Sequence, residues 1–244
     1  MPNISLRNVT CIYQNKHEEV RALDDLSIEF KDEKISSIIG ISGAGKTTLL
    51  KVIAGTIGYN GDIYYNDVNI NSYDVKTRNV SYVSQEIALY PHLNVFQNIA
   101  FPLSLTNALP DEIRSRVYDA AKMLQIENLL SRKPRQISIG QAQRVAIARA
   151  IIKRPNVYLF DEIFSNLDYK TTVQIRVDLK KVLKSLRATA IFVTHDVTEA
   201  LALSDYIYVI EDGKLVEEGS PMDIYNSKNE RVRDFFRSGD QNVI

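Results

Sequence analysis

Residues 35–48 read ISSIIGISGAGKTT, and this stretch decides the fold. The apolar run 35–39 predicts a buried strand. The next eight residues fit the pattern G-x-x-x-x-G-K-[ST] at every position, and residues 47–54 can continue as a helix. A strand, a glycine-rich loop and a helix in this order predict a phosphate site at the N-terminus of the helix.

The residue types of this loop suit phosphate chemistry. Gly43 and Gly45 permit backbone dihedrals and a close approach that a side chain would block, so that the backbone N–H groups can form a cradle for anionic oxygens. Lys46 would reach the β- and γ-phosphates, and the Thr47 hydroxyl would bind Mg²⁺. An ordinary glycine-rich turn is the alternative. The predicted nucleotide-binding residues here are Gly40, Ser42, Gly43, Ala44, Gly45, Lys46, Thr47 and Thr48.

Composition excludes several classes of protein. The 244 residues hold 30 Lys+Arg and 30 Asp+Glu, so the formal net charge is zero. A neutral chain offers no broad basic surface for nucleic acid and no polybasic membrane anchor. The single cysteine, Cys11, excludes an internal disulfide framework and a multi-cysteine zinc site. We also expect no signal peptide and no membrane-spanning helix, because no suitable apolar run is present.

The hydrophobic pattern predicts strands alternating with helices. This order favours a mostly parallel sheet covered on both faces. Residues 95–152 are helical in character and are predicted to be a subdomain inserted into one domain, 1–244. The predicted strands are 4–9, 23–30, 35–39, 61–65, 80–83, 156–160 and 189–193, followed by a hairpin of 206–210 and 215–218.

Two adjacent carboxylates, Asp161 and Glu162, follow the apolar strand 156–160. Parallel sheets place their ligand sites at the carboxyl ends of strands. Asp161 would hold Mg²⁺ through its water shell, and Glu162 would polarise the attacking water as general base. Because successive strand residues project to different sides, the two carboxylates can take separate roles. An acidic turn is the alternative interpretation.

With these motifs the chain resembles the nucleotide-binding subunit of an ATP-binding cassette (ABC) transporter. Residues 83–85 (VSQ) resemble the Q-loop of that family, 137–144 (ISIGQAQR) its signature, 165–168 (SNLD) its D-loop and 193–196 (VTHD) its switch histidine. The resemblance covers residues 4 to about 236. It implies an α/β fold with a P-loop NTPase core and mostly parallel sheet, an N-terminal antiparallel β subdomain and an inserted α-helical subdomain.

The resemblance also implies roles for single residues. Gln85 would contact Mg²⁺ and the attacking water, and His195 would be catalytic; alone, either residue would more often be a surface or structural side chain. His17 and His92 have no such context and are expected at the surface. The nucleotide-binding residues that the resemblance adds are Tyr13, which would stack on adenine, with Ser138, Gly140, Gln141 and Asp168.

The signature makes physical sense as an anion site. A serine hydroxyl and glycine N–H groups at a helix start face anions favourably. In the family this site faces the γ-phosphate held by the other subunit, so two subunits pair head to tail and hydrolysis needs a dimer. The resemblance therefore implies the cofactors ATP and Mg²⁺ and a homodimer or a closely related second ATPase subunit as partner.

Residues 89–103 (LYPHLNVFQNIAFPL) resemble importers of sugars, inorganic ions or polyamines. There this segment lies near the surface that receives the permease's coupling helix. The implied function is an ATPase that powers solute uptake at the cytoplasmic face of the membrane, with permease subunits and a solute-binding protein and without nucleic acid. The alternatives are a non-transport ABC ATPase in DNA repair or translation, and a nucleotide-sensing module without turnover.

Two positions depart from the family pattern. Ile139 replaces the first of two adjacent glycines, and Ile163 replaces a proline, which changes turn rigidity only. If position 139 needs a positive φ, a β-branched residue is strained there. We expect Gly140 to keep the anion site working, with weaker ATP-driven closure. Relatives often continue into a β-rich regulatory domain, so a short or truncated form is expected here.

Overall fold

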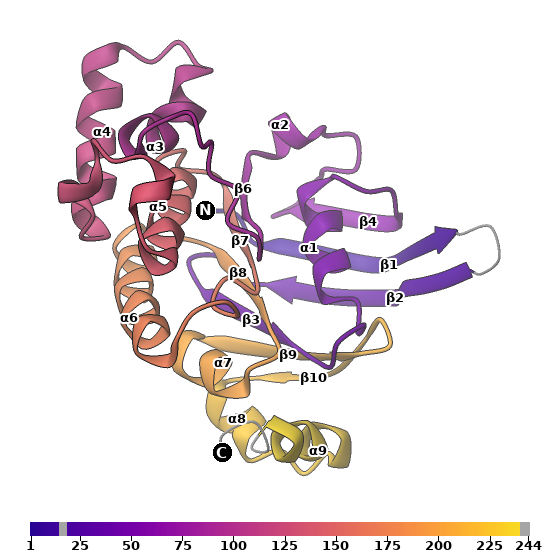
Figure 1. The fold of residues 1–244 in the computed structure, drawn as a ribbon. Helices are drawn as coiled ribbons and strands as arrows, with labels where there is room; N and C mark the ends of the chain where they lie inside the picture. The colour runs from indigo at the N-terminus through magenta and orange to yellow at the C-terminus, as the bar shows by residue number, and fades with distance from the viewer. Residues whose placement is uncertain (15–18, 240–244) are drawn as a thin grey trace.

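A six-stranded sheet forms the centre of the fold in the computed structural model, which describes residues 1–14 and 19–239 (Figure 1). The strand order is β10-β9-β3-β8-β7-β6, and all neighbours are parallel except the β9–β10 hairpin. This confirms the mostly parallel sheet. The strands are β3 (Ile35–Ile39), β6 (Val80–Val83), β7 (Val157–Asp161), β8 (Ala190–Thr194), β9 (Tyr206–Glu211) and β10 (Lys214–Gly219).

The expected antiparallel N-terminal sheet is also present, in the order β2-β1-β4-β5. Its strands are β1 (Ile4–Gln14), β2 (Glu19–Phe30), β4 (Asn60–Tyr65) and β5 (Val68–Asn69). Helix α1 (Lys46–Ala54) packs in one apolar cluster with this sheet and with the central strands. The phosphate loop at its N-terminus is therefore mounted on a buried helix.

A buried arginine secures the other end of α1. Arg78, the last residue of α2 (Val75–Arg78), is 2% exposed. Its Nη1 donates to the carbonyls of Val52 and Ile53 at 2.8 and 3.0 Å. A cation at a helix C-terminus satisfies carbonyls that lack a partner within the helix and opposes the negative end of the dipole.

The segment 95–152 is helical, as predicted. It comprises α3 (Val95–Ser104), α4 (Pro110–Met123), α5 (Ile139–Ile151) and the short turns η1 (Glu127–Leu129) and η2 (Pro134–Gln136). One face of α4, which carries Val117, Ala120 and Ala121, is buried. These helices share one apolar cluster with β7, β8 and α6 (Tyr169–Ser185). Whether the segment is a separate subdomain stays a prediction.

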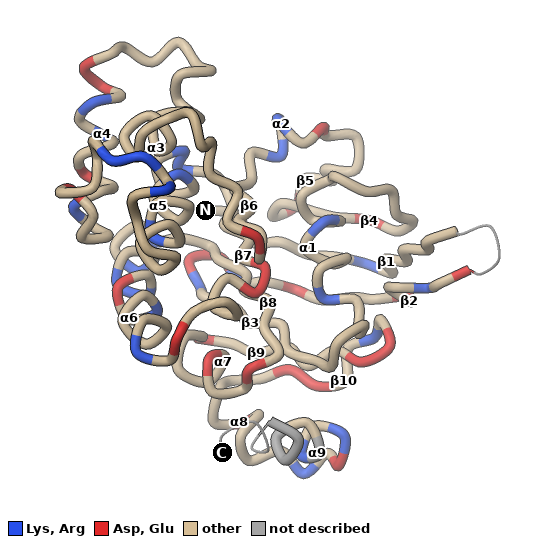
Figure 2. The backbone as a smooth tube through the Cα atoms, in the orientation of Figure 1, with Lys and Arg blue, Asp and Glu red and all other residues tan. Residues whose placement is uncertain are grey.

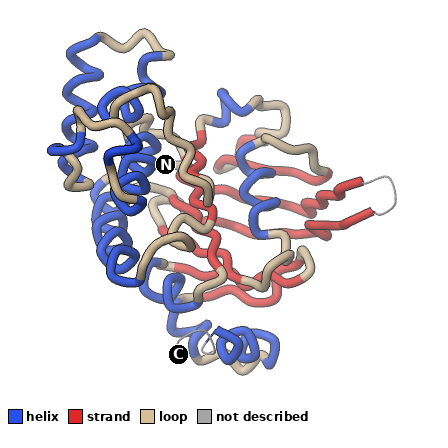
Figure 3. The backbone as a smooth tube through the Cα atoms, in the orientation of Figure 1, coloured by secondary structure: helices blue, strands red, loops and turns tan. Residues whose placement is uncertain are grey.

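Helices α3 to α6 gather on the left in Figure 3, α1 and α2 lie on the right beside the antiparallel strands, and the two helices that follow β10 lie at the bottom. The remaining helices, α7 (Val197–Leu203), α8 (Pro221–Tyr225) and α9 (Glu230–Gly239), were not predicted. The first two are too short for helical periodicity to identify. In the part of the chain that the structure describes, no helix is long and apolar enough to cross a membrane.

Charged residues of both signs are spread over the whole described backbone (Figure 2), in keeping with the zero net charge. The cluster at residues 31–34 is exposed, as expected for solvated charges. His92 lies at the surface as predicted. The prediction for His17 lies outside the described residues.

Candidate functional site

The glycines of the phosphate loop allow it to lie directly against neighbouring strands. Gly45 has φ 96°, and a Cβ there would lie 2.2 Å from the carbonyl oxygen of Ala22 in β2. A Cβ on Gly40 would lie 2.2 Å from the carbonyl oxygen of Ile210 in β9. No side chain fits at either position. The two glycines therefore allow the loop to pack directly against β2 and β9, as well as to adopt its conformation.

Lys46 is buried at the centre of this loop. Its Nζ donates to the carbonyl oxygens of Gly40 and Ile41, both at 2.8 Å. Burial lowers the pKa of Lys46, and the nearby carboxylates of Glu162 and Asp161 oppose that shift. The ammonium is thus presented on the loop itself, where a bound phosphate would meet it.

Two predicted metal residues meet at the end of β7. The Thr47 hydroxyl donates to Oδ1 of Asp161 at 2.9 Å. Their all-oxygen donor set suits Mg²⁺, which proteins hold with one or two side chains plus substrate phosphates. Among the described residues no cluster of three or more His, Cys, Asp and Glu could hold a metal ion. The residues present therefore fit Mg²⁺ held jointly with a nucleotide.

Sequence reasoning missed Tyr82 at the same carboxylate. The Tyr82 hydroxyl donates to Oδ2 of Asp161 at 2.6 Å. Burial, together with that hydrogen bond and the charge of Asp161, raises the pKa of Tyr82. The hydroxyl therefore stays protonated and acts as the donor. No sequence motif marks this residue, because its role arises from the pairing of β6 with β7.

Glu162 and His195 are brought together by neighbouring strands. Glu162 follows β7 and His195 follows β8, and Nδ1 of His195 lies 3.3 Å from Oε2 of Glu162. The predicted strand alternation does not set the direction of the Glu162 side chain, because β7 ends at Asp161. Glu162 has left the strand and adopts φ 47°, a conformation uncommon for a residue with a side chain. A carboxylate 21% exposed beside an imidazole can accept a proton from water.

The predicted Gln85 lies close to the same turn. Its Nε2 donates to the Ser165 hydroxyl at 3.3 Å, and that hydroxyl donates to the Glu162 carbonyl oxygen at 2.9 Å. The Q-loop and D-loop candidates therefore meet at the residue predicted as general base. Contact of Gln85 with Mg²⁺ stays a prediction.

Glu199 is a further carboxylate in this region that the sequence did not indicate. It lines a cavity of about 260 Å³ together with Glu162 and His195. The Thr194 hydroxyl donates to Glu199 Oε2 at 2.7 Å, and the Glu199 N–H donates to the Asp196 side chain at 3.1 Å. These two hydrogen bonds hold the loop that carries His195, because they join Glu199 to residues on either side of His195. Burial raises the pKa of Glu199 to about 6.

Tyr13 lies near the phosphate loop, on β1. Its hydroxyl is 3.3 Å from the hydroxyl of Thr48, and the residue is 39% exposed. An exposed aromatic ring beside the start of α1 offers a flat face for a nucleobase. Stacking on adenine stays a prediction.

The signature serine caps helix α5. Ser138 accepts a hydrogen bond from the Gln141 N–H, and the Gln141 side chain accepts one from the Ser138 N–H, which together form a capping box. Ile139 is the first helical residue, is 53% exposed, and its φ is not positive. The condition for backbone strain at Ile139 is therefore not met in the structure.

Gly140 joins the signature helix to the D-loop. A Cβ at Gly140 would lie 2.5 Å from the Thr171 methyl group on α6. The Thr171 N–H and hydroxyl both donate to the Asp168 carboxylate, at 3.0 and 2.6 Å, and cap that helix. In Figure 1 helices α5 and α1 lie apart, on either side of β6 and β7. The signature and phosphate loop of one chain therefore do not form a joint site.

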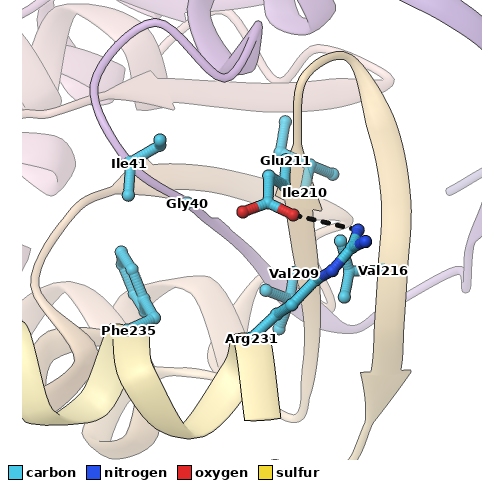
Figure 4. A pocket seen from close by; sticks show the side chains of 8 residues that line it. All are labelled: Gly40, Ile41, Val209, Ile210, Glu211, Val216, Arg231 and Phe235. Atoms are coloured by element: carbon cyan, nitrogen blue, oxygen red, sulfur yellow. Dashed lines mark hydrogen bonds and ion pairs between the residues drawn. The ribbon is translucent and has the colours of Figure 1, made fainter. Parts of the chain in front are cut away.

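A second cavity, of about 340 Å³, lies between the phosphate loop and α9 (Figure 4). Ile41 from the loop and Phe235 from α9 line it together with apolar residues of β9 and β10. Its charged pair is Arg231 and Glu211, 3.2 Å apart. The one cation in the lining that is described, Arg231, is paired with Glu211, and the remaining residues support the apolar side of the loop.

Known proteins resemble this chain in sequence and in fold. A family model described as "ABC transporter" matches residues 23–165. The sn-glycerol-3-phosphate import ATP-binding protein UgpC 3 of Agrobacterium fabrum is 42% identical over 226 residues, which cover 92% of this chain and 63% of the relative. The chain thus spans less than two thirds of that relative's length.

Solved structures of the ATP-binding cassette MJ0796 are similar in fold. One is a dimer in a post-hydrolysis state bound to ADP and Pi (TM-score 0.79), and the other is a dimer of what is described as a bacterial ABC transporter cassette (TM-score 0.80). Each is 32% identical to this chain, and each match covers 89% of this chain and 98% of the other.

The contact at Gly140 leads to a first prediction. Gly140→Ala should lower the melting temperature and weaken nucleotide-dependent activity, because the new methyl group overlaps the Thr171 methyl group on α6. Thr171→Ser removes that methyl group and keeps the hydroxyl that bonds Asp168, so the double variant should recover. Thermal melting of the four proteins measures this. Equal losses in the single Gly140→Ala and the double variant would contradict it.

The burial of Glu199 leads to a second prediction. The folded-state pKa of about 6 lies above the ordinary value, so the charged carboxylate costs stability at about pH 7.5. Glu199→Gln should therefore raise the free energy of unfolding there by up to about 2 kcal/mol. The gain should become small at about pH 4, where Glu199 is mostly protonated in both the folded and the unfolded chain. Urea unfolding at both pH values tests this, with the exposed Glu127→Gln as control; a gain independent of pH would refute it.

Proposed function

The chain belongs to the ABC transporter family, and on this premise we propose that it is the ATP-hydrolysing subunit that powers solute uptake through a separate membrane permease. The observation that carries the proposal is the Glu162–His195 pair at 3.3 Å, beside a phosphate loop whose Thr47 bonds Asp161. Phosphate binding, metal binding and proton acceptance are thus available at the ends of neighbouring strands. A module that only senses nucleotide would need no general base.

Different residues of the site bind the phosphates, bind the metal and accept the proton during hydrolysis. Lys46 and the loop N–H groups hold the β- and γ-phosphates of ATP. Thr47, Asp161 and Gln85 hold Mg²⁺, which when bound neutralises charge on the phosphates. Glu162 accepts a proton from the attacking water on its carboxylate, and Nδ1 of His195 fixes the orientation of that carboxylate. Tyr13 stacks on the adenine ring.

The active unit is a pair of cassettes. Ser138, Gly140 and Gln141 lie on α5, away from the phosphate loop of their own chain (Figure 1). A γ-phosphate contacted by both motifs must therefore lie between two chains, either two copies or this chain with a closely related ATPase subunit. The dimeric solved relatives support this arrangement. Asp168, through Thr171, ties the D-loop to the signature helix in each chain.

A groove of about 550 Å³ is the proposed docking site for the permease. Its walls come from β6, α3 and α5, and its rim carries Leu105, which is 73% exposed. Arg149 and Lys153 lie at the groove, and burial lowers the pKa of each. Tyr90 and Phe101 pack with ring centroids 4.5 Å apart. An apolar helix end with acidic or carbonyl groups fits this lining, and docking on such a permease segment would hold the chain at the cytoplasmic face of the membrane.

Import is favoured over repair or translation by the relative that is 42% identical, because its name describes an import ATP-binding protein. A solute-binding protein would complete such an importer. The neutral charge of the chain also offers nucleic acid little attraction.

The test of this function is Glu162→Gln. Removing the general base should lower kcat by about 100-fold or more, while the amide keeps the shape and leaves ATP binding intact. Size-exclusion chromatography with ATP and Mg²⁺ should then show a stable dimer that falls apart without nucleotide. Glu127→Gln serves as the control. Unchanged ATPase activity, or no ATP-dependent dimer, would disprove the proposal.

A further inference from the structure

Tyr82 and Thr47 approach the Asp161 carboxylate on different oxygens. The Thr47 hydroxyl donates to Oδ1 at 2.9 Å and the Tyr82 hydroxyl donates to Oδ2 at 2.6 Å. A carboxylate rotates easily about its last bond. With a donor on each oxygen, its plane and its outward lone pairs are fixed before any ligand binds.

The Tyr82 ring is itself held firmly. It is half-buried and packs against the apolar cluster that contains α1. The neighbouring residues of β6 are anchored on the opposite side, where the Ser81 hydroxyl donates to the Ala150 carbonyl oxygen at 3.0 Å and Lys153 Nζ donates to the Val80 carbonyl oxygen at 2.9 Å. Strand β6 is therefore held from the side of helix α5, while the Tyr82 side chain, which projects to the other side of the strand, donates to the carboxylate.

We propose that Tyr82 is a positioning residue for Mg²⁺ binding: its hydroxyl holds Oδ2 of Asp161, so that Oδ1 stays aimed at Thr47 and the metal. The inference rests on the proposed function, since that function assigns Mg²⁺ to Asp161. Groups that orient a metal ligand typically change metal affinity or activity by 10- to 100-fold when removed.

A matched pair of variants tests this role. Tyr82→Phe removes the hydroxyl and keeps the ring. Tyr158→Phe is the control, because Tyr158 is a buried tyrosine on the adjacent strand β7 whose hydroxyl has no hydrogen-bond partner among the described residues. The readout is the affinity of the isolated chain for a fluorescent ATP analogue, measured with Mg²⁺ and again with EDTA, together with the melting temperature.

We expect Mg²⁺ to strengthen binding of the analogue to the wild type. In Tyr82→Phe this gain should shrink about 10-fold, while the affinity in EDTA stays unchanged and the KM for MgATP rises more than kcat falls. Tyr158→Phe should alter none of these quantities. Direct Mn²⁺ titration of the ATP-bound chain by electron paramagnetic resonance should show the same loss in Tyr82→Phe.

Each contrary outcome has a distinct meaning. If the wild type gains nothing from Mg²⁺, the proposed function fails at its metal assignment. If the wild type gains and Tyr82→Phe gains equally, the positioning role is overturned. It is overturned as well if Tyr82→Phe loses affinity equally with Mg²⁺ and with EDTA, since a merely structural residue would act in that way.

Discussion

The hydrogen bond from Thr47 to Asp161 is the contact on which the rest of the structure depends. It joins the first turn of α1 to the end of β7 and so places the phosphate loop over the carboxyl ends of the central strands. The contacts of the loop and of α1 with their neighbours support that placement. Gly45 and Gly40 allow the phosphate loop to pack against β2 and β9. Arg78 donates hydrogen bonds to the C-terminal end of α1, and the antiparallel sheet packs on that helix.

The proposed ATP site is divided between two parts of one chain, and each part is mounted on packed elements. The phosphate half rests on α1 and the ends of β7 and β8. The signature half rests on α5, which is joined to α6 by the close approach of Gly140 to Thr171 and by the buried ion pair of Arg144 and Asp178 at 2.8 Å. Two halves that lie apart in one chain are the arrangement expected if nucleotide completes a site between two chains.

Secondary-structure elements and motifs that depend on neighbouring residues in the sequence could be predicted. Contacts between residues far apart in the sequence could not. The run 35–48 carries its strand, loop and helix in the local pattern, and the structure has all three. Tyr82 and Glu199 had no signal, because their partners come from other elements or from a fold-dependent turn. Glu162 was expected to follow strand alternation, whereas a left-handed backbone turns it toward His195.

In the proposed mechanism, the phosphate loop of one chain and the signature of another act on the same ATP. Mixing two inactive variants tests it most directly: Lys46→Ala lacks the phosphate contact, and Ser138→Arg blocks the signature. A mixed dimer contains one intact site, so ATPase activity should reappear on mixing, in proportion to the mixed dimers formed. If the mixture stays as inactive as either variant while both remain folded and still dimerise, the two-chain site is wrong.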